Sequence, residues 1–129
     1  MPRARVVYYK DEKGRAPVLD WLDDCRSDDA IARCRDKIER LQAQGHEARR
    51  PVCAHLDGDI HEIRARVGKA NYRILFAFHG HVAVVLLHGC TKEDVVPVSD
   101  IKRANERLGK YLKDPEARTY SEFPDDYPE

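Results

Sequence analysis

Residues 59–88 carry three consecutive stretches with the hydrophobic pattern of β-strands. Residues 59–67 alternate between apolar and charged side chains, which indicates one buried face and one charged face. Residues 71–79 also alternate, and residues 82–88 are almost wholly apolar, as expected for a central strand that is covered on both faces. The short connection at residues 79–81 suits a hairpin turn. We therefore predict a meander of three antiparallel strands.

The segments on either side of this meander predict one further strand and three helices. Their order is β-α-α-β-β-β-α, which predicts an α+β domain: a small antiparallel sheet with two N-terminal helices and one C-terminal helix. The predicted elements are a strand at residues 5–9, a helix beginning at Pro17, a helix from Ser27 or Asp28 to Gly45, a loop over residues 46–58, and a helix opened by Pro97 and ended by Asp114.

Charge is distributed unevenly along the chain. There are 23 basic and 23 acidic side chains, and residues 114–129 hold six of the acids but only one of the bases. We predict one domain at residues 1–113, with a net charge of about +5, and an acidic C-terminal tail at residues 114–129. A basic body suits a polyanionic partner, because phosphate contacts release counterions. A solvated surface of mixed charge is the alternative.

Several classes of protein lose support from motifs that the sequence lacks. The N-terminus has no apolar signal region, and the longest apolar run, residues 82–87, is too short to span a bilayer. We therefore expect no membrane partner. The four cysteines form no CxxC pair, which favours reduced thiols in a cytoplasmic protein. No GxSxG, P-loop, GxGxxG or HExxH motif is present, which argues against serine hydrolases, NTPases, dinucleotide enzymes and zincins.

The predicted meander gathers basic side chains at one end of the sheet. Clustered cations repel one another, which costs stability unless an anion fills the site, so the cluster favours a phosphate site. The alternative is that Arg64 and Arg66 only cover the solvent face of their strand and pair with Glu62. The cations of the cluster are Arg64 and Arg66 on one strand, Lys69 in the turn, Arg73 on the next strand and Lys92 in the loop after the third.

Histidine and cysteine spacings raise the question of a metal. The pairs at residues 79 and 81 and at residues 88 and 90 each share a strand face, but neither belongs to a zinc motif, so we expect no metal and no other cofactor. His88 ends the apolar strand beside the basic cluster, where an imidazole could act as an acid or base. The alternative for His88 is a buried, hydrogen-bonded residue at the end of a strand.

Four segments in order carry a family resemblance. The chain is similar, over about residues 5–112, to the RelE/HigB-like toxins of type II toxin–antitoxin modules, in particular to their phage-derived HigB-like branch. The resemblance implies the fold predicted above, with a toxin domain at residues 1–113. The segments are HLDGDIHEIR at residues 55–64, NYRILFAF at 71–78, VLLHGCTK at 85–92 and PVSDIKRA at 97–104.

The resemblance also implies a function and its residues. Members of the family cut mRNA as metal-independent endoribonucleases (mRNA interferases), many of them in the ribosomal A site. It implies catalytic roles for Arg64, Arg73 and Lys92, with His88 or Tyr72 as acid–base candidates; a regular strand turns Tyr72 away from Arg73. We expect Arg66 and Lys69 to bind RNA.

Partners and alternatives follow from the same resemblance. The expected partners are mRNA, the ribosome and a helix-turn-helix antitoxin, which would bind the toxin in an oligomeric complex. Two alternatives stay open: a ParE-like toxin that inhibits DNA gyrase without cutting nucleic acid, and a degenerate toxin that acts only as a binding partner. A separate hypothesis is that the acidic tail at residues 114–129 folds back into the basic groove as a mimic of RNA phosphates. The alternative is that the tail is disordered and only aids solubility.

Overall fold

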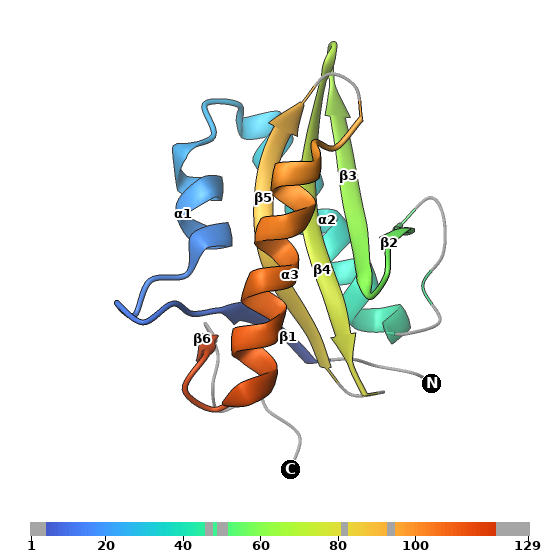
Figure 1. The fold of residues 1–129 in the computed structure, drawn as a ribbon. Helices are drawn as coiled ribbons and strands as arrows, with labels where there is room; N and C mark the ends of the chain where they lie inside the picture. The colour runs from blue at the N-terminus through green and yellow to red at the C-terminus, as the bar shows by residue number, and fades with distance from the viewer. Residues whose placement is uncertain (1–4, 46–47, 49–51, 81–82, 93–94, 121–129) are drawn as a thin grey trace.

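The fold is a six-stranded sheet with helices on both faces (Figure 1). The computed structural model describes residues 5–45, 48, 52–80, 83–92 and 95–120. The strands are β1 (Arg5–Tyr9), β2 (Ala54–Asp57), β3 (Ile60–Val67), β4 (Ala70–His79), β5 (Ala83–Lys92) and β6 (Thr119–Tyr120), and the helices are α1 (Pro17–Asp24), α2 (Asp28–Gln44) and α3 (Val98–Lys113). The sheet order is β2-β3-β4-β5-β1-β6.

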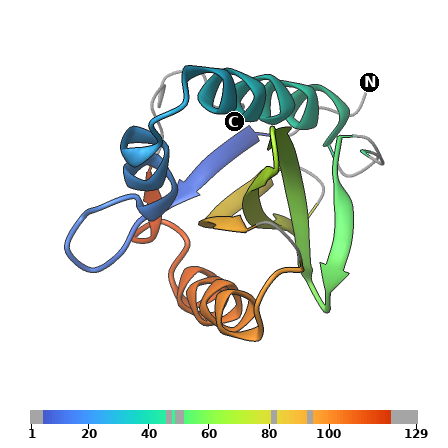
Figure 2. The same ribbon diagram turned by 90° about the horizontal axis from the view of Figure 1, so that it is seen from above.

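The sheet is mostly antiparallel, which confirms the predicted α+β class and the meander of β3, β4 and β5. Only β1 runs parallel to its neighbour β5 in the described sheet. Figure 2 shows α2 and α3 on opposite sides of the sheet. Helices α1 and α2 cover a core that includes Ile74 and Phe76, and α3 covers a second core that includes Leu75 and Leu87. Both faces of β4 and β5 are therefore buried.

The helix boundaries follow the predicted signals. The hydroxyl of Ser27 accepts a hydrogen bond of 3.1 Å from the backbone N–H of Ala30, which caps the start of α2. Gly45 ends α2 at a positive φ of 60°, a conformation that costs glycine little. Pro17 occupies the first turn of α1, where its missing N–H is not needed.

Strand β5 is longer than the sequence pattern predicts. It runs to Lys92, so this residue belongs to the strand and not to the loop where we expected it. The pairing of β5 with β4 shifts between Leu86 and His88, which leaves Leu87 as an extra, bulged residue. Because the side-chain period of a strand is two, the bulge changes which face His88 and the residues after it occupy.

Two short strands were not predicted. Strand β2 lies within residues 46–58, where we expected a loop, and β6 lies within the predicted tail. Strand β6 pairs with β1 at the edge of the sheet opposite β2 and β3. Residues 119–120 therefore join the sheet at the edge away from β2 and β3, and residues 121–129 lie outside the described residues. Part of the predicted turn at residues 79–81 lies outside them as well.

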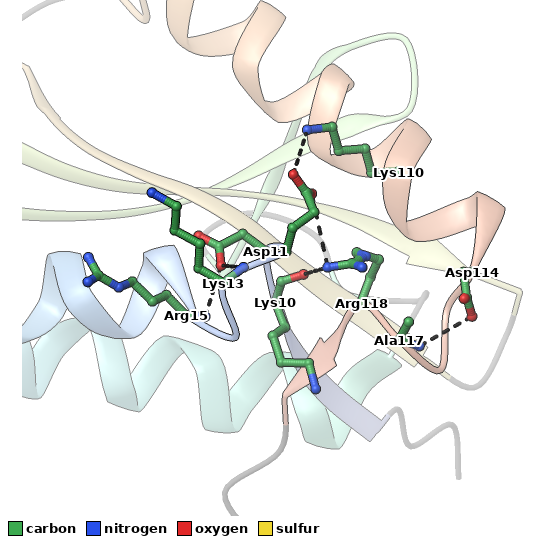
Figure 3. A network of polar contacts seen from close by, with 9 residues as sticks. Lys10, Asp11, Lys13, Arg15, Lys110, Asp114, Ala117 and Arg118 are labelled. Atoms are coloured by element: carbon green, nitrogen blue, oxygen red, sulfur yellow. Dashed lines mark hydrogen bonds and ion pairs between the residues drawn. The ribbon is translucent and has the colours of Figure 1, made fainter.

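Polar contacts hold the segment before β6 in place (Figure 3). Lys10 donates its backbone N–H to the carbonyl of Arg118 at 2.8 Å, and the Arg118 guanidinium lies 3.4 Å from the Lys10 carbonyl. The Glu12 carboxylate lies 3.5 Å from Lys110 and 4.0 Å from Arg118. Helix α3 and the C-terminal segment are thus tied to the loop after β1.

None of the helices in the described part of the chain has the length and apolar character that crossing a bilayer requires.

Candidate functional site

The register of the meander places most of the predicted site residues on one face of the sheet. Leu75 and Cys90 belong to the core beneath α3, so their cross-strand neighbours also occupy the α3 side. Residues directly opposite each other in antiparallel strands share a face. Three cross-strand rows result: Glu62, Leu75 and His88; Arg64, Arg73 and Cys90; and Arg66, Asn71 and Lys92.

A cleft of about 340 Å³ opens over these rows at the start of α3. Its floor is the face of β3 and β4 that carries Arg64 and Arg73. Its walls are strand β2 and the segment before α3. Val95 on the rim is 75 % exposed. The residues that line the cleft are Ala54, His55, Leu56, Glu62, Arg64, Arg66, Asn71, Arg73, Val95 and Val96.

A buried ion pair lies in the floor of the cleft. A guanidinium nitrogen of Arg73 (Nη1) lies 3.0 Å from Oε2 of Glu62, and 3.4 Å from its Oε1. Arg73 is 5 % exposed and Glu62 is 6 % exposed. Each of the two charges compensates the other, because a single buried charge without a partner would strongly destabilise the fold. Arg73 therefore reaches the cleft with its charge already balanced by Glu62.

Arg64 is the accessible arginine of this group. Its side chain is 43 % exposed, and its Nε lies 4.0 Å from Oε1 of Glu62. A carboxylate thus lies between two guanidinium groups, one buried and one open to solvent. Arg66 and Lys69 are exposed further along the same hairpin, and Lys92 stands opposite Asn71 in the register. The Lys92 side chain lies outside the described part of the structure.

His88 links β5 to α3. Its Nδ1 lies 2.9 Å from the Arg107 guanidinium and its Nε2 lies 2.7 Å from Asp100 Oδ1. An arginine can only donate, so Nδ1 accepts, and the ring proton sits on Nε2 and is donated to Asp100. Burial lowers the pKa of His88 below its ordinary value of 6.5, and Arg107 lowers it further, while Asp100 opposes both. The ring is hydrogen-bonded on both sides, as in the alternative to acid–base chemistry, but His88 lies within β5 and not at its end.

The bulge explains the position of Arg107. The Arg107 guanidinium also donates to the Leu87 carbonyl at 2.9 Å. A bulged residue is displaced from the regular ladder, so its backbone groups need partners elsewhere. Arg107 supplies one of these partners and orients the His88 ring with the same nitrogen.

Three potential metal ligands meet beside this link. One ligand atom each of His88, Cys90 and Asp100 lies within 4.8 Å of the others. A metal on Nε2 of His88 would require the ring proton to move to Nδ1, where it would face the Arg107 N–H. The Arg107 charge also disfavours a cation at this position. The donor set therefore fits a metal poorly, although sequence spacing could not have revealed Asp100 as its third member.

One further sequence prediction can be placed, and one residue is added. Tyr72 lies on the α1 and α2 side of the sheet, where its ring centroid is 6.4 Å from that of Trp21 and away from Arg73. The structure adds Glu62 as the only acid among the described residues that line the cleft. The sequence signal for Glu62 was its place on the charged face of β3, two residues before Arg64.

Comparison with known proteins gives the family. The sequence model of the family described as "Phage derived protein Gp49-like (DUF891)" matches residues 20–109, which include α2, the whole meander and most of α3. The chain belongs to this Gp49-like family. No curated protein matches the sequence significantly. The Gp49-like match contains every residue that we predicted for the site, and it excludes β1 and β6.

Proposed function

We propose that this Gp49-like protein is the toxin of a type II toxin–antitoxin module and that it cuts mRNA without a metal. The observation that supports this function best is the cleft in which the exposed Arg64 stands beside the buried Arg73–Glu62 pair. An accessible guanidinium suits a phosphate, which it binds through paired N–H donors. The resemblance of the four sequence segments to RelE/HigB-like toxins supports the same assignment.

The proposed chemistry uses the nucleophile that RNA already carries. The 2′-oxygen attacks the adjacent phosphorus, the bond to the 5′-oxygen breaks, and the products are a 2′,3′-cyclic phosphate and a 5′-hydroxyl. Arg64 would stabilise the charge that develops on the phosphoryl oxygens. Glu62 is the carboxylate in the cleft to which the proton of the 2′-hydroxyl would pass.

The second proton transfer, to the departing 5′-oxygen, has Lys92 as its candidate. The departing 5′-oxygen needs a proton, which Lys92 would supply, or Lys92 would stabilise the developing charge; its row in the sheet is next to that of Arg64. His88 is a weaker candidate than it was on the sequence, because both ring nitrogens already have partners. Arg73 would position Glu62 through their 3.0 Å ion pair.

The proposed setting is the cytoplasm, where mRNA and ribosomes are available. A ribosome would hold the codon in line for attack, which lowers the entropy that the enzyme itself must remove. A helix-turn-helix antitoxin would block the cleft in an oligomeric complex. The gene next to this one should then encode such a protein.

Expression without the antitoxin tests the proposal. The wild-type chain should arrest growth, and mapping of RNA 5′-ends should show new 5′-hydroxyl ends within translated regions. The Arg64→Ala variant, expressed to the same level, should give neither effect. Growth arrest with intact mRNA and a loss of DNA supercoiling would replace the ribonuclease with a gyrase inhibitor, and normal growth on wild-type expression would favour a degenerate toxin.

A further inference from the structure

A second, larger cavity lies on the other side of β3 from the cleft. This groove has a volume of about 730 Å³ and runs between α2 and the edge of the sheet. From α2 it is lined by Arg33, Lys37 and Arg40, which share one face of the helix at spacings of four and three residues. These three positions span about 10 Å along the helix axis, so the wall is longer than a single phosphate needs.

The groove is positively charged. Five basic residues line it against two acids, Asp36 and Glu62. Both acids already have partners, because Arg40 lies 3.1 Å from Asp36 and Arg73 lies 3.0 Å from Glu62. Partial burial lowers the pKa of Lys37, repulsion from the nearby charges of Arg40 and Arg64 lowers it further, and Asp36 opposes them. An anion in the groove would relieve this repulsion.

The groove and the cleft meet at β3, where they share lining residues. Strand β2 pairs with β3 only at residues 60–62, so among the described residues no strand covers the outer edge of β3 beyond that point. Arg33 reaches across to the edge and donates to the Arg66 carbonyl at 2.8 Å. The residues that line both cavities are Ala54, Glu62, Arg64, Arg66 and Asn71.

We propose that the groove between α2 and β3 binds the ribose–phosphate backbone of the RNA strand beside the cleaved nucleotide. The strand would cross the open edge of β3 past Arg64 and Arg66, with one phosphate in the cleft and the next ones along α2. This inference rests on the proposed ribonuclease function. RNA is favoured over an acidic protein segment because the groove shares five lining residues with the cleft assigned to the scissile phosphate.

Binding of uncleavable RNA tests this path. Fluorescence anisotropy would compare 2′-O-methyl RNAs of about 4 and about 12 nucleotides, of which only the longer fills both cavities. Each phosphate contact on a single strand contributes about −0.7 to the slope of log affinity against log salt. For the longer RNA, the double variant Lys37→Glu/Arg40→Glu should make this negative slope shallower by about 1.4 and should weaken binding about tenfold or more. Binding of the shorter RNA should be unchanged.

A charge-matched control separates the groove from overall charge. Arg35→Glu/Lys113→Glu makes the same change at two exposed positions that do not line the groove. This variant should keep the advantage of the longer RNA, and thermal unfolding should show that both variants are folded. Equal losses in the two variants, or no loss in the groove variant, would overturn the inference.

Other occupants give different results. Polyglutamate and an unlabelled RNA of equal charge would be compared as competitors of the long RNA. If both displaced it equally well, the groove would serve an acidic protein segment and the inference would be overturned. A groove variant that sedimented less with ribosomes but bound the long RNA normally would assign the groove to ribosomal RNA, which also overturns it. Groove-dependent binding by a wild-type protein that makes no 5′-hydroxyl ends would support the groove and overturn only the ribonuclease.

Discussion

The guanidinium of Arg73 and the carboxylate of Glu62 form a 3.0 Å ion pair in the floor of the cleft, with each residue at most 6 % exposed. Strands β3 and β4 carry these residues two positions apart in the register, since Arg73 stands opposite Arg64 and Glu62 stands opposite Leu75. The contact is therefore diagonal, and it joins the core beneath α3 to the open site. This gives Arg73 a structural role that its position in the sequence did not indicate.

Removing one partner of this pair should destabilise the fold. Arg73→Met or Glu62→Leu alone should lower the free energy of unfolding by about 3–5 kcal/mol, because each removes the 3.0 Å partner of a buried charge. The double variant Glu62→Leu/Arg73→Met should recover most of this loss and still fail to cut RNA. Urea denaturation checks the first point. Additive losses in the double variant would contradict the coupling.

Arg64 offers a cleaner test of catalysis, since its side chain is partly exposed. Arg64→Ala should reduce the cleavage rate about 10²- to 10³-fold, the usual effect of losing one group that stabilises the transition state. The midpoint of urea unfolding should not change. Arg103→Ala, which removes an exposed cation from α3, is the matched control and should keep full activity. A small loss for Arg64→Ala would remove it from the site.

His88 should make stability depend on pH. Its pKa is lowered in the folded protein, so between that value and 6.5 the unfolded chain binds more protons than the folded chain. The contribution of neutral His88 is therefore complete above pH 6.5 and is lost as the pH falls through this window. The His88→Gln variant should lose this part of the pH dependence as the pH falls below about 6.5. Equal slopes for both proteins would contradict it.

Gly89 is required by the indole of Trp21. A Cβ added at Gly89 would overlap Cγ, Cδ2 and Cε3 of the Trp21 ring, so Gly89→Ala should cost about 1–3 kcal/mol of stability. Gly109 in α3 has open space around it, and Gly109→Ala should instead add about 0.5–1 kcal/mol, because alanine favours a helix. Thermal unfolding of both variants checks the opposite signs.

Arg107 should keep metals away from His88. The wild-type activity should be insensitive to chelators once ribosome integrity is maintained with excess magnesium. Arg107→Leu frees Nδ1 of His88 and removes a charge, so its zinc affinity should rise about 10- to 100-fold in competition with a chromophoric chelator. Arg103→Leu removes a nearby charge but no hydrogen bond, so a similar rise in that variant would attribute the effect to charge alone.

Much of the fold could be predicted because it is encoded in local patterns. The alternation in residues 59–67 specified a strand with one buried face, and Ser27, Gly45 and Pro17 specified helix ends, since these signals act within a few residues. Strands β2 and β6 were missed because four and two residues carry too little periodicity. They form only because β3 and β1 offer open edges.

The sequence by itself determined which residues carry charge and that the three strands of the meander pair in order, and these two facts already placed Arg64 and Arg73 in one site. Only the tertiary structure decided how deep each residue lies and what it contacts. The bulge at Leu87 set the face of His88, the diagonal contact buried Glu62 against Arg73, and α2 brought Arg33 to the β3 edge. These relations join residues that are distant in the chain, so no local pattern could encode them.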